Sequence, residues 1–244
     1  MVHEYTRDLQ IPLRTSDRDP VRKQVYFDFL RTQFTKNLES ETFPPKAYRK
    51  NLVSIVPANS EIIIGGTGII LNEGGFVLTA LHLVQCFQRK RELVSQYRMK
   101  REDAIQYAID PSFFAWDEEH DLAILRAMEE IRYIDPIKIA SREPIENEDL
   151  LYYSFPNGGR IVETRGRVKT PSEDVYLSSS GQEKRRKDSL VFSGRADFGY
   201  SGSPIFTSDG LLAVLFGGDA QENILATKSS YVRTLIECAR DSLY

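Results

Sequence analysis

Two serines stand between glycines in the segment DFGYSGSP, residues 197–204. A serine hydroxyl is a weak nucleophile. It needs a base within hydrogen-bonding reach, a group that orients this base, and donors for the oxyanion that forms. A glycine two residues before the serine lets the backbone turn so that two N–H groups point to one place. This pattern nominates Ser201 over Ser203, with the N–H groups of Gly199 and Ser201 as the oxyanion hole.

The base of such a serine would be a histidine, and the chain has three histidines. His3 lies in a polar stretch, and His120 belongs to the acidic segment WDEEHD, which favours a surface position. His82 stands where the strand-like run GGFVLTALHLV ends, and it is the preferred base, although a lone histidine in an apolar run is more often structural. Asp121 opens the run DLAIL and is the candidate for orienting His82, although an acid there commonly just ends a strand.

The elements that must position these residues are short apolar runs that begin near residue 52. The runs are rich in Ile, Val, Leu, Phe and Tyr, with Gly, Asp, Asn or Pro between them. This pattern predicts many short strands and an all-β sandwich or barrels. A polar boundary within 130–147 divides the strands into residues 51–140 and residues 141–244, and the second part ends in a short helix from about Ser229.

An N-terminal extension over residues 1–50 precedes the strands. Asp19 as N-cap and Pro20 at the first helical position predict a helix over 19–38. Its apolar stripe consists of Phe27, Leu30, Phe34 and Leu38. The stripe fits packing on the body of the protein, and a partner or membrane face is the alternative.

Composition excludes several classes of protein. The net charge of −3 argues against a dedicated nucleic-acid binder. The start of the chain lacks a secretory signal, and the longest apolar run, LLAVLF, is too short to cross a bilayer, so a cytoplasmic protein is predicted. No Cys/His spacing fits a zinc site, and GGTG lacks the lysine of a phosphate-binding loop, so neither metal nor cofactor is expected.

Two basic segments, 88–102 and 183–188, are interpreted as solvated loops, with a helix within 88–106. The alternative for both is contact with an acidic substrate, a nucleic acid or an anionic surface.

Four segments together resemble the trypsin-like serine peptidases of the chymotrypsin fold, in particular the Deg (high-temperature-requirement) branch without its PDZ domain. In chain order they are GTGIILNEGGFVLTALHLV, HDLAIL, DLLYYSFPNGGRIVETRGRV and GYSGSPIFTSDGLLAVLFGG. The resemblance implies two six-stranded antiparallel β-barrels, with His82 and Asp121 on the first and Ser201 on the second. The chain ends at Tyr244 with no room for a PDZ domain, so regulation of that type is not expected.

The resemblance also implies a serine endopeptidase that hydrolyses polypeptides through an acyl-enzyme. His82 would be the general base and then the general acid, Asp121 would orient it, and Ser201 would be the nucleophile. Two segments would bind substrate, a pocket wall and a strand that pairs with substrate backbone: Arg195, Ala196 and Phe198, and Leu215, Phe216 and Gly217. A small or medium apolar residue is expected before the cut, and Arg195 keeps an acidic preference open.

Tyr200 departs from the family pattern, which has an acid in trypsin and usually Asn in the Deg branch. Trypsin-style activation by a freed N-terminus is therefore not expected, and a bulky ring next to Ser201 bears on the shape of the oxyanion hole. The alternative function is a proteolytically silent scaffold. A latent protease is intermediate, with a partner that engages the N-terminal helix or the basic loop 88–102.

Overall fold

The computed structural model describes residues 45–57, 65–85, 97–156, 159–179, 182–219 and 222–241, together with Asp28 and Thr32. The helix predicted over 19–38 lies outside these ranges, apart from Asp28 and Thr32, which are helical and exposed.

The first six strands close into an antiparallel barrel in the order β1-β2-β3-β6-β5-β4. Their bounds are β1 Leu52–Pro57, β2 Gly66–Ile70, β3 Phe76–Ala80, β4 Tyr97–Lys100, β5 Gln106–Asp117 and β6 Leu122–Ala127. A 3-10 helix, η2 (Pro45–Asn51), precedes β1, and a second one, η3 (Leu81–Leu83), follows β3 directly.

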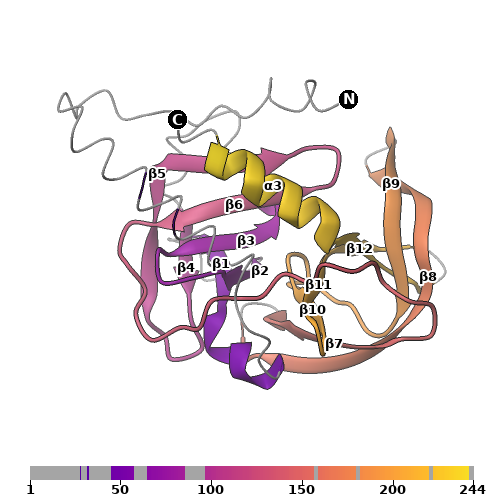
Figure 1. The fold of residues 1–244 in the computed structure, drawn as a ribbon, viewed down its shortest axis with the longest axis horizontal. Helices are drawn as coiled ribbons and strands as arrows, with labels where there is room; N and C mark the ends of the chain where they lie inside the picture. The colour runs from indigo at the N-terminus through magenta and orange to yellow at the C-terminus, as the bar shows by residue number, and fades with distance from the viewer. Residues whose placement is uncertain are drawn as a thin grey trace.

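The next six strands close into a second antiparallel barrel in the order β10-β11-β12-β9-β8-β7. Their bounds are β7 Asp149–Ser154, β8 Val162–Ser179, β9 Gln182–Ser193, β10 Pro204–Thr207, β11 Gly210–Gly218 and β12 Ile224–Lys228. The helix α3 (Ser229–Asp241) follows β12. In Figure 1 the barrels lie side by side, and α3 runs from the second barrel across the first. The predicted pair of six-stranded barrels with a short C-terminal helix is therefore confirmed.

The helix expected within 88–106 is wrong where the chain is described. Residues 97–100 form β4, which pairs with β1, and the turn after it leads into β5. The basic residues obscured the strand pattern, because Met99 is the one buried side chain of β4 and only the partly buried Tyr97 packs against the same cluster.

Three large apolar clusters show how the barrels are filled. One consists only of residues from the first barrel and the segment after it, and one only of residues from the second half of the chain. The third combines both barrels with η2 and α3. Strand β3 serves two of them by alternation, since Val77 belongs to the first-barrel cluster whereas Phe76 and Leu78 belong to the shared one. The shared cluster holds the two barrels in one arrangement.

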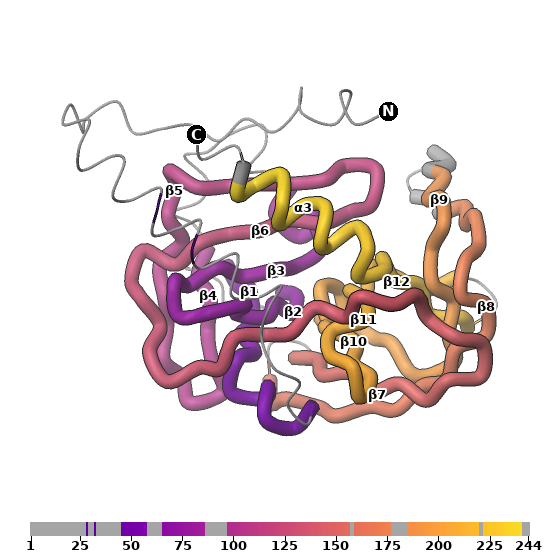
Figure 2. Tube along the Cα trace, viewed as in Figure 1, coloured from indigo at the N-terminus to yellow at the C-terminus, as the bar shows by residue number. Residues whose placement is uncertain are grey.

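The hairpin of β8 and β9 is longer than its barrel requires. In Figure 2 it rises past the start of α3. Tyr231 of α3 and Lys228 at the end of β12 both donate hydrogen bonds to Asp188 of β9. These bonds tie the hairpin to the helix. Among the described residues, no helix is long and apolar enough to span a membrane.

Candidate active site

His82 and Asp121 form a hydrogen-bonded pair at the end of β3. His82 lies in η3 and its side chain is 40% exposed, whereas the side chain of Asp121 is only 4% exposed. Nδ1 of His82 lies 2.6 Å from Oδ2 of Asp121, and the backbone N–H of His82 donates to Oδ1 at 3.0 Å. An ionised carboxylate only accepts hydrogen bonds, so this contact assigns the ring proton to Nδ1. Nε2 is then the nitrogen that can accept a proton.

The backbone of Asp121 is also fixed. Its φ is 57°, in the left-handed region that Asp tolerates better than most residues. Its carbonyl oxygen accepts the N–H of Leu81 at 2.8 Å. Asp121 therefore holds η3 by its main chain and by its carboxylate.

The loop that carries Ser201 is docked on the first barrel by Thr67 of β2. The N–H of Thr67 donates to the carbonyl oxygen of Ser201 at 2.8 Å, and its hydroxyl donates to that of Gly199 at 2.8 Å. The N–H of Phe155 in turn donates to the Thr67 hydroxyl at 2.9 Å. Because β2 pairs with β3, these bonds place the loop beside the strand that leads to His82.

Gly202 makes this close approach sterically feasible. Its φ is 82°, and a Cβ added there would lie 2.0 Å from the carbonyl oxygen of Thr67 and 2.4 Å from the hydroxyl of Thr79. Thr79 lies on β3, three residues before His82. A side chain at position 202 would push the serine loop away from the histidine.

The two serines of the loop have different surroundings. Ser203 is fully buried, and its Oγ lies 2.7 Å from Oγ of Ser154. Ser201 is partly exposed, and its hydroxyl makes no hydrogen bond with a described residue. Of the two, only Ser201 combines exposure with an unengaged hydroxyl.

The N–H groups expected to form the oxyanion hole are open. Within the described part of the chain, neither Gly199 nor Ser201 donates a backbone hydrogen bond. Their neighbours do: the N–H of Tyr200 donates to Asp197 at 3.1 Å, and the N–H of Gly202 donates to Leu215 at 2.7 Å. Unused and satisfied N–H groups thus alternate along residues 199–202.

Tyr200, the departure from the family pattern, turns away from the site. Its side chain is buried in the second-barrel cluster, where its ring meets that of Tyr152 edge-to-face at 6.3 Å. The hydroxyl of Tyr152 donates to the carbonyl oxygen of Arg195 at 2.6 Å and accepts its N–H at 2.8 Å. Burial raises the pKa of Tyr152 to about 12. The rings of Tyr152 and Tyr200 therefore support the Ser201 loop from the core of the second barrel.

The side chains predicted to bind substrate fall into two groups. Arg195, Ala196 and Phe198 are exposed, Phe198 by 77%. Leu215 and Phe216 of β11 are buried, so that strand can offer a substrate its backbone but not these side chains. An added Cβ at Gly217 would meet no atom within 4 Å, so the backbone there is open to approach.

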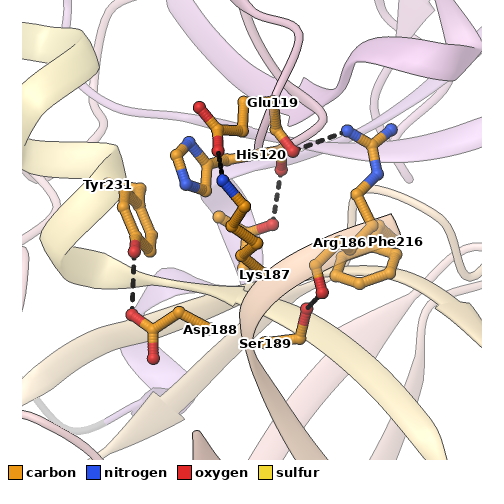
Figure 3. A pocket seen from close by; sticks show the side chains of 9 residues that line it. Glu119, His120, Arg186, Lys187, Asp188, Ser189, Phe216 and Tyr231 are labelled. Carbon is orange, nitrogen blue, oxygen red and sulfur yellow. Dashed lines mark hydrogen bonds and ion pairs between the residues drawn. The ribbon is translucent and has the colours of Figure 1, made fainter. Parts of the chain in front are cut away.

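Two interpretations from the sequence are wrong here. His120 is buried rather than on the surface: its Nδ1 lies 2.7 Å from Asp117 Oδ2, and its ring stacks on Tyr231 at 3.5 Å (Figure 3). The segment 183–188 is part of strand β9 and not a solvated loop. Arg186 within it is 7% exposed, and its Nη2 lies 3.3 Å from Oδ1 of Asp121.

Arg186 is a site residue that reasoning from the sequence missed. Strand alternation was the signal that could have found it, since the basic run EKRRKD must send every second side chain inward if it is a strand. Arg185 and Lys187 are exposed, and Arg186 between them is buried.

Two closed barrels, with a histidine and an aspartate on one and a serine loop of the other docked beside them, define the class of the trypsin-like serine peptidases. The model of the trypsin-like peptidase domain matches residues 66–213, more than half of the chain, and the chain belongs to this family. A search of curated proteins finds no match.

Solved structures with the same fold include two forms of a protease of M. tuberculosis. The active form of the Rv3671c protease has a TM-score of 0.63 at 18% identity, covering 82% of this chain and 88% of that one. The inactive form gives 0.59 at 19%, covering 81% and 96%. The serine endoprotease from Yersinia pestis gives 0.61 at 16%, covering 87% and 67%. At these identities the likeness establishes the fold alone.

Proposed function

We propose that this chain is a serine endopeptidase that cleaves peptide bonds through an acyl-enzyme, with Ser201 as nucleophile, His82 as base and Asp121 as the group that orients the base. The observation that carries the proposal is the bonding of one buried carboxylate to both the ring and the backbone of His82. The docking of the Ser201 loop on β2, with its hydroxyl unengaged, supports it.

In the first half of the reaction, Oγ of Ser201 attacks the carbonyl carbon of the substrate while Nε2 of His82 takes the hydroxyl proton. Asp121 stays ionised and stabilises the imidazolium. The N–H groups of Gly199 and Ser201 donate to the oxyanion, and loss of one such donor costs about 10²–10³ in rate.

The C–N bond then breaks, and His82 gives its proton to the departing amine, which leaves an ester on Ser201. In the second half, His82 takes a proton from water as the water oxygen attacks the ester. Collapse of this second intermediate returns the proton to Ser201 and releases the carboxylic acid. These steps require neither a metal nor a cofactor.

We place the polypeptide substrate along β11, where its backbone would pair with Leu215, Phe216 and Gly217 as an added strand. The open approach at Gly217 supports this placement. The residue before the cut would meet the wall of Arg195, Ala196 and Phe198. We expect it to be small or medium and apolar, with an acidic residue as the alternative.

A fluorophosphonate probe tests the proposal, because it reacts with a serine only where base and oxyanion hole are assembled. We expect mass spectrometry to locate one adduct on Ser201 in the wild type and in Ser203→Ala, and none in Ser201→Ala. Ser203→Ala is the matched control, since it removes a hydroxyl two residues away that is buried against Ser154.

A wild-type protein that is folded but stays unlabelled would contradict an assembled protease. Labelling that begins only when a candidate partner is added would support the latent alternative. Absence of labelling even with candidate partners would support the alternative of a proteolytically silent scaffold.

A further inference from the structure

The guanidinium of Arg186 lies where the second barrel meets the Asp121 turn of the first. Nη1 donates to the carbonyl oxygens of Glu118 and Glu119, to the latter at 2.7 Å. Nη2 lies 3.3 Å from Oδ1 of Asp121. Figure 3 shows this side chain reaching from β9 to the backbone at Glu119. One side chain thus bonds three points within a stretch of four residues.

The hairpin holds Arg186 in this place by packing. Arg186 pairs in register with Val175 of β8. Val175 belongs to a small apolar cluster with Val191, Phe216 and Leu225, which fastens the inner face of the hairpin to β11 and β12. Arg186 therefore projects from an anchored surface and not from a free loop.

The chemistry of the contact favours an arginine. A carboxylate that is only 4% exposed needs hydrogen-bond donors or a counter-charge, because burial penalises its ionised form. A guanidinium has donors in fixed, coplanar directions, so it can bond two carbonyls and a carboxylate together, as a lysine ammonium cannot do with the same geometry. Arg186 supplies both the counter-charge for Asp121 and hydrogen bonds that fix the turn carrying this carboxylate.

We propose that Arg186 is a positioning residue for this active site, which acts through Asp121 by fixing the carboxylate and its turn against His82. The inference rests on the proposed function, since it assigns a role within that same site. It makes the β8–β9 hairpin a part of the active site, although the hairpin contributes none of the three reacting residues.

The other ionisable groups around this junction are paired among themselves. Glu119 lies 3.4 Å from Lys187, His120 is bonded to Asp117, and Asp188 is bonded to Lys228 and Tyr231. Among the described residues, Arg186 is the only Lys or Arg side chain that forms an ion pair with Asp121. Removal of its charge should therefore act on Asp121 directly and on His82 through Asp121.

The first test compares Arg186→Met with Lys187→Met in the kinetics of peptide cleavage. For Arg186→Met we expect kcat to fall about 10²-fold with little change in KM, because a misplaced base slows the chemical step. The acid limb of the pH–rate profile should move to higher pH, because the uncompensated carboxylate favours the protonated ring. Lys187→Met removes the same charge from the next residue, and it should change neither the kinetic constants nor the pH–rate profile. Compared with Arg186→Met, Arg186→Lys should bring the acid limb back toward its wild-type position more fully than it restores kcat, because lysine supplies the charge without the geometry of the guanidinium.

The second test does not need activity. In the Ser201→Ala background, NMR can follow protonation of the His82 ring, since only three histidines must be assigned. We expect Arg186→Met to raise the pH at which this ring takes up its proton, and Lys187→Met not to. If Arg186→Met does not fold, Arg186→Gln replaces it as the neutral variant.

Equal protonation of the ring in the parent and in the neutral Arg186 variant would overturn the role of Arg186. Absence of cleavage and of probe labelling in the wild type would instead overturn the proposed function. The two failures are therefore distinguishable.

Discussion

Two neighbouring tyrosine rings behind the serine loop differ in what their hydroxyls do. The hydroxyl of Tyr152 bonds both the N–H and the carbonyl oxygen of Arg195. The hydroxyl of Tyr200 bonds no described residue, although its ring is equally buried. The same substitution at the two positions therefore separates a hydrogen-bonding role from a packing role.

We expect Tyr152→Phe to lower the free energy of unfolding by about 1–2 kcal/mol, because two backbone groups lose their partner. It should also raise KM for peptides several-fold, since Arg195 belongs to the proposed pocket wall. Tyr200→Phe should change neither. Urea unfolding and steady-state kinetics measure both quantities. Equal effects from the two substitutions would show that the hydroxyl of Tyr152 does not hold the wall.

The candidate site residues differ in how far the sequence could predict them. Ser201, His82 and Asp121 each stand in a local pattern with a chemical meaning, and the structure brings His82 and Asp121 together as expected. Arg186 has no such pattern, because its partner lies 65 positions away across the barrel interface. The sequence shows only that Tyr200 is bulky and not an acid, and the fold shows that its ring points inward.

At the scale of elements, Asp188 joins the hairpin to the end of β12 and to α3. It accepts hydrogen bonds from Lys228, Tyr231 and Ser172. Burial works to raise the pKa of Asp188, but the hydrogen bonds from these three side chains outweigh it, and the pKa lies below its usual value. Its φ of 51° is one that Asn also tolerates, so Asp188→Asn removes the charge without straining the backbone.

We expect Asp188→Asn to lower the free energy of unfolding by about 1 kcal/mol or more at neutral pH, because the buried Lys228 loses one of its carboxylate partners. A depressed pKa stabilises the folded state above the unfolded value near 3.8, and this contribution is lost as the pH falls through the folded pKa. The difference between wild type and variant should therefore shrink below about pH 4.

Chemical unfolding at pH 7 and near pH 3 measures this difference. Asp149→Asn is the control, because it removes a carboxylate whose partner Arg167 is exposed, and it should have little effect at either pH. A difference for Asp188→Asn that is equally large at both pH values would contradict the role of its charge.

Element type followed from the sequence where runs were apolar and bounded by turn residues. Strands β2 and β3 fall inside the predicted run GTGIILNEGGFVLTALHLV, and β6 begins inside DLAIL. The two basic segments were misread because their charged residues obscured the alternation of a strand. In β4 only Met99 is buried, and within residues 185–188 of β9 only Arg186 is buried. The closure of each barrel depends on pairings between distant strands, such as β1 with β4, which no local pattern encodes.

The whole molecule is held together by the apolar cluster that both barrels share with α3. The helix contacts β5 of the first barrel as well as β11 and β12 of the second. Ile236 lies fully buried in this cluster. We therefore expect the described body to unfold as one cooperative unit.

We expect Ile236→Ala to lower the free energy of unfolding by about 2–5 kcal/mol and to keep a single transition. The only tryptophan, Trp116, lies on β5 and packs on Phe114, so its fluorescence follows the first barrel, whereas far-UV circular dichroism follows all strands. Both midpoints should move together. Thr234→Ala, on the exposed side of α3, is the control. Separate transitions for the two signals would show that the barrels unfold independently.

The shared cluster also sets an order of events during synthesis. The last strand of the first barrel, β6, is made about 100 residues before α3, which at a typical rate of synthesis is roughly 5–20 s. Throughout that interval the part of the cluster on the first barrel, which includes Leu78, lacks the packing that the second barrel and α3 supply, and exposed apolar surface of this kind favours aggregation of a nascent chain. The proposed site follows the same order, because Ser201 lies just before β10 of the second barrel and cannot meet His82 until that barrel has been made.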